Sequence, residues 1–248
     1  MLSALGRVEL IIVMEETRPK NLSAAIRALY ENATRLLEDA QYLMEYGRFP
    51  TSYALSILAQ EEYAKTFLLF LVGDDAIPWN AEVRRALRDH TCKQLIASIM
   101  EYLDAEWQKL ISQCFDPAQF RRSFPSNVAD ALNIVRHEKV PRMPEWSWVD
   151  DALVDKQARA IADGEVDKQK QNALYVGLGK TGQVYSSPTS ITETEATLEH
   201  KKTQRLMAMF SPYGENVELF KNIEYSRVSD SFKMLFGTLS LEEYTKRW

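Results

Sequence analysis

The sequence predicts an all-α protein, and two observations support this fold class. Apolar residues recur every three or four positions through most of the 248 residues, which is the spacing of one helix face. Glycine or proline, which commonly terminate helices, separates the periodic segments. The chain has only nine glycines and nine prolines, which argues against low complexity and against a disordered chain. We therefore expect an antiparallel helical bundle.

The first two helices are expected to form an antiparallel hairpin. From Leu22 to Gly47 the apolar side chains follow a helical stripe that closes at a glycine. Pro50 then begins a second helix, which is apolar nearly throughout and ends near Gly73. Because only a few residues join the two helices, they should pack side by side.

A third helix is expected to begin after Asn80, a residue favoured at helix N-caps, and to continue until shortly before Pro117. A shorter helix should follow at about residues 127–139. Both cysteines, Cys92 and Cys114, fall on the third helix, too far apart for a disulfide. A reducing cytoplasm is therefore the expected location.

The second half of the chain continues the helical pattern. A helix is expected over about residues 150–176, with Gly164 as the point where it divides. The clearest loop of the chain follows at residues 177–190. A capping-box pattern at residues 192–195 then begins a helix that runs to about Phe210.

The domain organisation is expected to be simple. Residues 21–210 should form one helical domain, preceded by an N-terminal extension of residues 1–20. Residues 211–248 should form a tail of two or three short helices packed on that domain, the last of them beginning at Ser240. The aromatic side chains of this tail are expected to serve core or dimer packing. Only the first 14 residues look strand-like.

Charge and composition exclude some classes of function. The net charge is −5, with 26% charged and 46% hydrophobic residues, which is ordinary for a soluble globular protein. This charge does not favour nucleic-acid binding by the whole surface, although basic residues cluster locally. The apolar run at residues 10–14 is too short for a membrane span or a signal-peptide core, so we expect no membrane association.

A carboxylate within the apolar second helix is the first candidate site residue. At about 100° per residue, Glu62 falls on the same face as Leu55 and Leu58, so it is expected to point into the bundle. Glu61 and Lys65 lie about a quarter turn away at i,i+4 spacing and are expected to form an ion pair at the rim. A buried carboxylate must be paired, hydrogen-bonded or protonated. Glu62 is therefore either a structural anchor for a neighbouring helix or part of a site.

Two further stretches supply partners for this carboxylate. His90 and Lys93 lie at one edge of the third helix and can face a common cleft. Lys170 lies on a different side of its helix from a polar row at i, i+4 and i+7 spacing. The residues of that row are Lys168, Asn172 and Tyr175. Spacing alone leaves two alternatives for the row, a site lining and the cap of a packed interface.

Several familiar motifs are excluded by their context. Residues 177–182 match the dinucleotide-binding glycine pattern, but no βαβ unit surrounds them. His137 and Glu138 begin a zinc-protease motif whose second histidine position is Pro141. The chain has no E-x-x-H pair for a di-metal bundle and no C-x-x-C. We therefore expect no metal and no cofactor.

Three motifs occur in a specific order and spacing. They are Glu61-Glu62-Tyr63-Ala64-Lys65, His90-Thr91-Cys92-Lys93, and Lys168 or Lys170 shortly before Leu174-Tyr175-Val176. Over roughly residues 22–210 this order resembles the AbiV family of bacterial abortive-infection proteins, within the HEPN group of helical domains. The resemblance implies a HEPN-like antiparallel helical bundle with additional C-terminal helices. HEPN ribonucleases typically carry R-x(4–6)-H, for which Arg84 or Arg85 with His90 are the literal matches.

The resemblance also implies a function, antiviral defence by a toxin-like effector. Such a protein stays quiet until phage infection and then arrests host translation or growth, acting on RNA or on the translation machinery. The resemblance further implies a homodimer and a phage protein as the trigger.

If the protein is a metal-independent ribonuclease, the resemblance implies roles for the candidate residues. His90 acts as general acid and base, and Lys93, with Lys170 or Lys168, holds the scissile phosphate. Glu62 orients a cation or the imidazole, and Tyr175 stacks on a base or donates a hydrogen bond. The remaining candidates for substrate contact are Glu61, Lys65 and Asn172.

Two other functions are compatible with the same residues. One is a non-catalytic interaction module that binds a phage or ribosomal protein, in which Glu62, Lys93 and Tyr175 form a structural polar network. The other is a metabolic enzyme with a small-molecule pocket between helices, which no cofactor motif supports.

Overall fold

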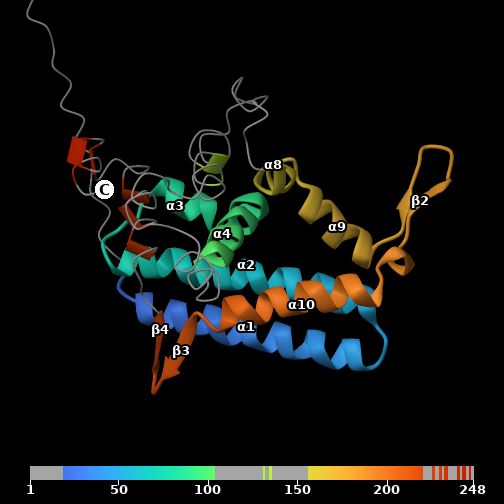
Figure 1. Cartoon of the computed structure of the whole chain (residues 1–248), viewed down its shortest axis with the longest axis horizontal. Coiled ribbons are helices and arrows are strands. Elements are labelled where there is room, and N and C mark those ends of the chain that lie inside the picture. Colours follow the sequence, from blue (N-terminus) through green and yellow to red (C-terminus); the bar gives the residue numbers. More distant parts are fainter. Residues whose placement is uncertain are drawn as a thin grey trace, which may run out of the picture.

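The computed structural model describes residues 19–103, 131, 134–135, 156–219, 225–226, 229–230, 232–233, 239–240, 242–243 and 246. In these ranges the protein is a mostly helical bundle, as predicted, with two small β-hairpins (Figure 1). The strand-like first 14 residues and most of the predicted helix at 127–139 lie outside these ranges. None of the described helices is long and apolar enough to cross a membrane.

Helices α1 (Leu22–Glu45) and α2 (Phe49–Gly73) form the predicted antiparallel hairpin (Figure 1). Gly47, in the turn between them, has a φ of 68°, a left-handed conformation that glycine adopts at little cost. Helix α1 buries a single stripe of its surface, as its amphipathic pattern requires. Helix α2 is buried on most of its circumference, because α1, α4, α9 and α10 all pack against it.

Within residues 80–103 the predicted third helix is two helices, α3 (Ala81–Ala86) and α4 (His90–Tyr102). Its expected continuation toward Pro117, which includes Cys114, lies outside the described residues. Asn80 caps α3 and Asp89 caps α4, each accepting a 2.9 Å hydrogen bond from the backbone N–H three residues on. An aspartate that satisfies first-turn N–H groups favours a new helix start over a continuous helix. The break makes His90 the first residue of α4, so the phase of a continuous helix does not relate it to the arginines of α3.

The later helices follow the sequence more closely. Helices α8 (Lys156–Ala162) and α9 (Glu165–Leu174) divide at Gly164, whose φ is 79°, as predicted. Helix α10 (Glu193–Met207) begins with the predicted capping box at residues 192–195 and ends three residues before the predicted end.

The prediction that strands occur only at the N-terminus is wrong. The region expected to be a loop contains the antiparallel pair β1 (Gly177–Leu178) and β2 (Val184–Ser186), followed by the short helical turn η3 (Pro188–Ser190). A second hairpin, β3 (Phe210–Tyr213) with β4 (Asn216–Leu219), follows α10. Strands of two to four residues are too short for an alternating pattern to be recognised.

The main core lies between α1, α2, α4 and α8 and receives the tail. Phe210 of β3 stacks on Tyr63 of α2 with ring centroids 5.7 Å apart. Tyr225 and Phe232 of the tail are buried in the same core, which confirms core packing for these two aromatics. A separate set of polar contacts joins α10 to α2. Gln60 Nε2 donates to Glu199 Oε1 at 2.7 Å and to Thr203 Oγ1 at 2.9 Å.

Candidate functional site

A buried carboxylate on α2 joins three helices. Glu61 is only 1% exposed and lies where α2 meets α4 and α9. Its Oε1 accepts hydrogen bonds from Lys170 Nζ at 2.7 Å and Gln94 Nε2 at 3.0 Å. Its Oε2 lies 2.8 Å from Lys93 Nζ and 2.6 Å from His90 Nδ1. We call the residues gathered here the Glu61 cluster: Glu61, His90, Lys93, Gln94, Asp167 and Lys170.

His90 lies at the solvent-exposed side of this cluster, with 53% of its side chain exposed. An ionised carboxylate only accepts hydrogen bonds, so the 2.6 Å contact with Glu61 places a proton on Nδ1. The neutral ring then carries its lone pair on Nε2, the nitrogen that a substrate can approach. The ammonium groups of Lys170 and Lys93 lie 3.2 and 3.4 Å from the same Nδ1. Because they also only donate, these are close approaches and not hydrogen bonds.

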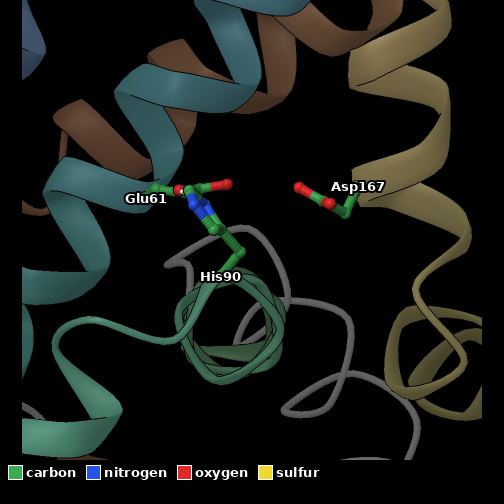
Figure 2. Close-up of side chains that lie close together, drawn as sticks. All are labelled: Glu61, His90 and Asp167. Carbon is green, nitrogen blue, oxygen red and sulfur yellow. Dashed lines mark hydrogen bonds and ion pairs between the residues drawn. The ribbon is translucent and has the colours of Figure 1, made fainter.

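Lys170 bridges two carboxylates. Its Nζ lies 2.7 Å from Glu61 Oε1 and 2.7 Å from Asp167 Oδ1. Figure 2 shows Glu61, His90 and Asp167 projecting toward one another from α2, α4 and α9, and their ligand atoms all lie within 4.8 Å of each other. Such a group resembles a metal-ligand set. The ammonium already bridges the two carboxylates, so a metal ion would have to displace Lys170.

The charged groups of the cluster stabilise the ionised forms of one another. Burial raises the pKa of the Glu61 carboxyl, but hydrogen bonds from Lys170 and Lys93 and their charges outweigh it, so this pKa lies below its usual value. Burial lowers the pKa of Lys170, but hydrogen bonds to Asp167 and Glu61 outweigh it, so this pKa lies above its usual value. The charges of the two carboxylates and the two ammonium groups cancel. A second proton on the neutral His90 ring therefore gives the cluster a net positive charge.

The prediction that Glu62 points into the bundle is wrong, because Glu61 does so. Glu62 instead forms a 2.5 Å ion pair with Lys65, and their side chains are 17% and 21% exposed. The predicted rim pair of Glu61 with Lys65 is wrong for the same reason. Leu55 and Leu58, which were expected to mark the buried face, are only partly buried. The apolar residues of α2 surround the helix, so their positions did not indicate which face meets which neighbour.

Sequence reasoning placed some residues of the cluster correctly and missed others. His90 and Lys93 contact the same carboxylate, that of Glu61, and Lys170 joins them from α9. The polar row on another side of α9 makes no described hydrogen bond to Glu61; its residues are Lys168, Asn172 and Tyr175. Gln94 and Asp167 were missed, although their spacing gave a signal. Gln94 follows His90 at i+4, and Asp167 precedes Lys170 at i−3.

The two lysines near the start of α9 allow a matched test of the site. Lys170→Met is expected to destabilise the protein by about 2 kcal/mol, because Glu61 and Asp167 lose the ammonium between them. Lys168→Met, on the exposed side of the same helix, should change stability by less than about 0.5 kcal/mol. Urea unfolding of both variants measures the difference. Equal losses would contradict the position of Lys170.

His200 of α10 gives the protein a pH dependence outside the cluster. It is 3% exposed, and within the part of the chain that the structure describes neither of its ring nitrogens has a hydrogen-bond partner. Burial lowers its pKa in the folded state. The unfolded chain therefore binds a proton at this residue from about pH 6.5 downward, whereas the folded chain binds it only at a lower pH. Folding stability should fall as the pH drops below that value, by up to about 1.4 kcal/mol per pH unit.

The test is urea unfolding at pH 7 and at pH 5.5, for wild type and for His200→Met. The variant should lose less stability between the two pH values, because it no longer carries this titrating group. Equal pH dependence in the two proteins would show that His200 is not the group responsible.

Comparison with known proteins gives one match. A family model described as HEPN_AbiV, AbiV, matches residues 21–208. This range includes the whole Glu61 cluster and all the described helices from α1 to α4 and from α8 to α10. No curated protein and no solved structure matches the chain.

Proposed function

Because this chain belongs to the AbiV family of HEPN-like abortive-infection proteins, we propose that it is an antiphage effector that acts as a metal-independent ribonuclease. The observation that carries the proposal is the pair of His90 and Glu61. A half-exposed imidazole is held through Nδ1 by a buried carboxylate, which leaves Nε2 for proton transfer. This is the arrangement that general acid–base catalysis needs, in which a base is oriented by a third group.

The proposed reaction is cleavage of RNA through its own 2′-hydroxyl group. Nε2 of His90 removes the proton of the hydroxyl, whose oxygen attacks the adjacent phosphorus, and the bond to the 5′-oxygen breaks. The products are a 2′,3′-cyclic phosphate and a 5′-hydroxyl, and the leaving 5′-oxygen receives the proton that His90 took from the 2′-hydroxyl. Glu61 keeps the imidazole in its orientation and stabilises the imidazolium that forms.

Lys93 and Lys170 supply positive charge beside the reacting phosphate in this proposal. Their side chains are 8% exposed and paired with Glu61, so they act through their field more than by enclosing the phosphate. Lys168, Asn172 and Tyr175 are proposed to contact RNA farther along α9. The orienting role expected for Glu62 is assigned to Glu61, since Glu62 pairs with Lys65.

The wider biological setting is part of the proposal and comes from the family. The protein is proposed to act as a homodimer, to respond to a phage protein and to arrest translation or growth by cleaving RNA of the translation machinery.

The test is sequencing of RNA ends after brief expression in a bacterium. Wild type is compared with His90→Ala and with Lys201→Ala, a change at an exposed position of α10. New ends at defined positions should occur with wild type and Lys201→Ala but not with His90→Ala. Growth arrest with intact RNA in all three strains would reject the ribonuclease.

A second candidate function, a non-catalytic interaction module, is favoured by one surface feature. The end of α9 and the β1–β2 hairpin expose several large apolar side chains at one end of the bundle (Figure 1). They are Leu174, Tyr175, Val176, Leu178, Val184 and Tyr185. Exposed apolar patches commonly mark protein contacts.

The interaction module makes a distinct prediction. Changing Val184 and Tyr185 to serine should abolish growth arrest, while His90→Ala leaves growth arrest intact. The opposite pattern would reject the module and leave the ribonuclease.

A further inference from the structure

Gln94 is the neutral partner of the buried carboxylate. It lies on α4 one turn after His90, is buried, and donates from Nε2 to Glu61 Oε1 at 3.0 Å. The other three partners of Glu61 are two ammonium groups and an imidazole. Gln94 is therefore the one partner in this set that cannot change its charge with pH.

The other end of the same amide is unsatisfied. Gln94 Oε1 is buried and has no hydrogen-bond partner among the described residues. Leaving a buried polar atom unpaired costs about 1–3 kcal/mol. Turning the amide over does not help, because it would place two oxygens 3.0 Å apart at Glu61. Methionine would fill a similar volume and remove this cost, which offsets the loss of the hydrogen bond to Glu61, so stability alone gives little reason for an amide here.

The Gln94 amide is placed to restrict the rotation of the Glu61 carboxylate. The Glu61 carboxylate can rotate about its last bond, and the long side chains of Lys93 and Lys170 can follow such a rotation. Gln94 is attached to the same helix as His90 and is enclosed by the core. Its N–H holds Oε1, which leaves Oε2 directed at Nδ1 of His90.

We propose that Gln94 is a positioning residue that fixes the Glu61 carboxylate and thereby the tautomer of His90. With Oε2 held against Nδ1, the neutral ring keeps its proton on Nδ1 and its lone pair on Nε2. The role in catalysis rests on the proposed ribonuclease function. The tautomer itself is a property of the folded protein and can be measured without any activity.

The experiment is nitrogen NMR of the histidine side chains, at a pH at which the nitrogen signals themselves show neutral rings. The chain has three histidines, so comparison with His90→Ala assigns the His90 signal. Wild type should show His90 protonated at Nδ1. Gln94→Met should shift a substantial fraction of His90 to the tautomer protonated at Nε2, with folding stability equal to wild type or higher.

A matched control comes from a glutamine outside the cluster. Gln41 donates to Glu45 at 2.9 Å on the exposed side of α1, so Gln41→Met removes a similar contact and should leave the His90 signal unchanged. Gln94→Asn, whose amide is one carbon too short to reach Glu61, provides a second variant and should behave like Gln94→Met. An unchanged His90 tautomer in either folded Gln94 variant would overturn the proposal.

The kinetic consequence separates this inference from the proposed function. If wild type cleaves RNA, Gln94→Met should lower kcat in proportion to the fraction of His90 that the NMR shows in the wrong tautomer, with little change in KM, because a ring in that tautomer cannot act as the base. An unchanged kcat would overturn the catalytic role of Gln94. If wild type does not cleave RNA, the ribonuclease proposal fails, and the NMR result alone decides whether Gln94 positions His90.

Discussion

Replacing Glu61 by glutamine is expected to lower the free energy of unfolding by about 3–5 kcal/mol, the usual cost of removing one partner from a buried charge network. The amide removes the negative charge, so the ammonium groups of Lys93 and Lys170 remain buried without full compensation. The NH₂ group of the glutamine would also face the N–H donors of Lys170 or His90, at a position where the carboxylate oxygen accepts hydrogen bonds. Urea unfolding at neutral pH measures the loss.

The next residue provides the control. Glu62→Gln is the same chemical change one position away, but its partner Lys65 and Glu62 itself are partly exposed to water. Such ion pairs are worth about 0–1 kcal/mol, so this variant should lose no more than that. If the two variants lost equal stability, the assignment of Glu61 as the buried partner would be wrong.

The largest effect on activity is expected for His90→Ala. A positioned general base and acid contributes about 10²–10⁴-fold to a rate, so cleavage of RNA by the purified variant should fall by that factor. Stability should change little, because the imidazole is half exposed and lies at the edge of the cluster. The measurement is the rate at which 2′,3′-cyclic phosphate ends appear in a single-turnover assay.

Two controls make this result specific. Lys201→Ala should cleave at the wild-type rate, since the residue is exposed on α10. Unfolding curves of His90→Ala show whether any loss of rate comes from a loss of folded protein. Wild-type cleavage by a folded His90→Ala variant would remove His90 from the mechanism.

Local signals predicted most helices well. The start of α10 follows from a Thr192–Glu195 capping box, whose hydrogen bonds form within one helical turn. The break between α8 and α9 follows from Gly164, because glycine adopts a left-handed conformation that other residues avoid. In both cases the residues that determine the structure are neighbours in the sequence.

The break before α4 shows where this reasoning reached its limit. Asp89 is as good an N-cap as Asn80, but the apolar stripe around it favoured a single continuous helix. The choice between one helix and two depends on how α4 packs on α2 and α3 on α4, which the local pattern does not contain. As a result, His90 was expected in the interior of a long helix, whereas it lies in the first turn of α4.

The buried face of α2 could not be predicted, for a different physical reason. Sequence reasoning took leucines as the mark of the interior, yet small polar residues such as Ser52 and Ser56 are fully buried there. Their hydroxyl groups donate to backbone carbonyls, Ser52 to that of Ala40 on α1 at 2.7 Å. A polar residue is stable in the interior when a partner is present, and partners on other helices appear only once the chain has folded. The same argument explains why Lys170, and not Lys168, reached the site.

Adjacent residues of α2 contact different helices, and this restricts where residues can be inserted or deleted in α2. Gln60 contacts α10, whereas Glu61 contacts α4 and α9. Consecutive side chains of a helix point about 100° apart, so both sets of contacts exist at only one rotation of α2. Inserting or deleting a single residue between Ser52 and Gln60 would rotate the two parts of α2 by about 100° relative to each other. The residues on one side of the change would then point away from their partners. Natural insertions and deletions in related chains should therefore fall in the turns at either end of α2 and not within it.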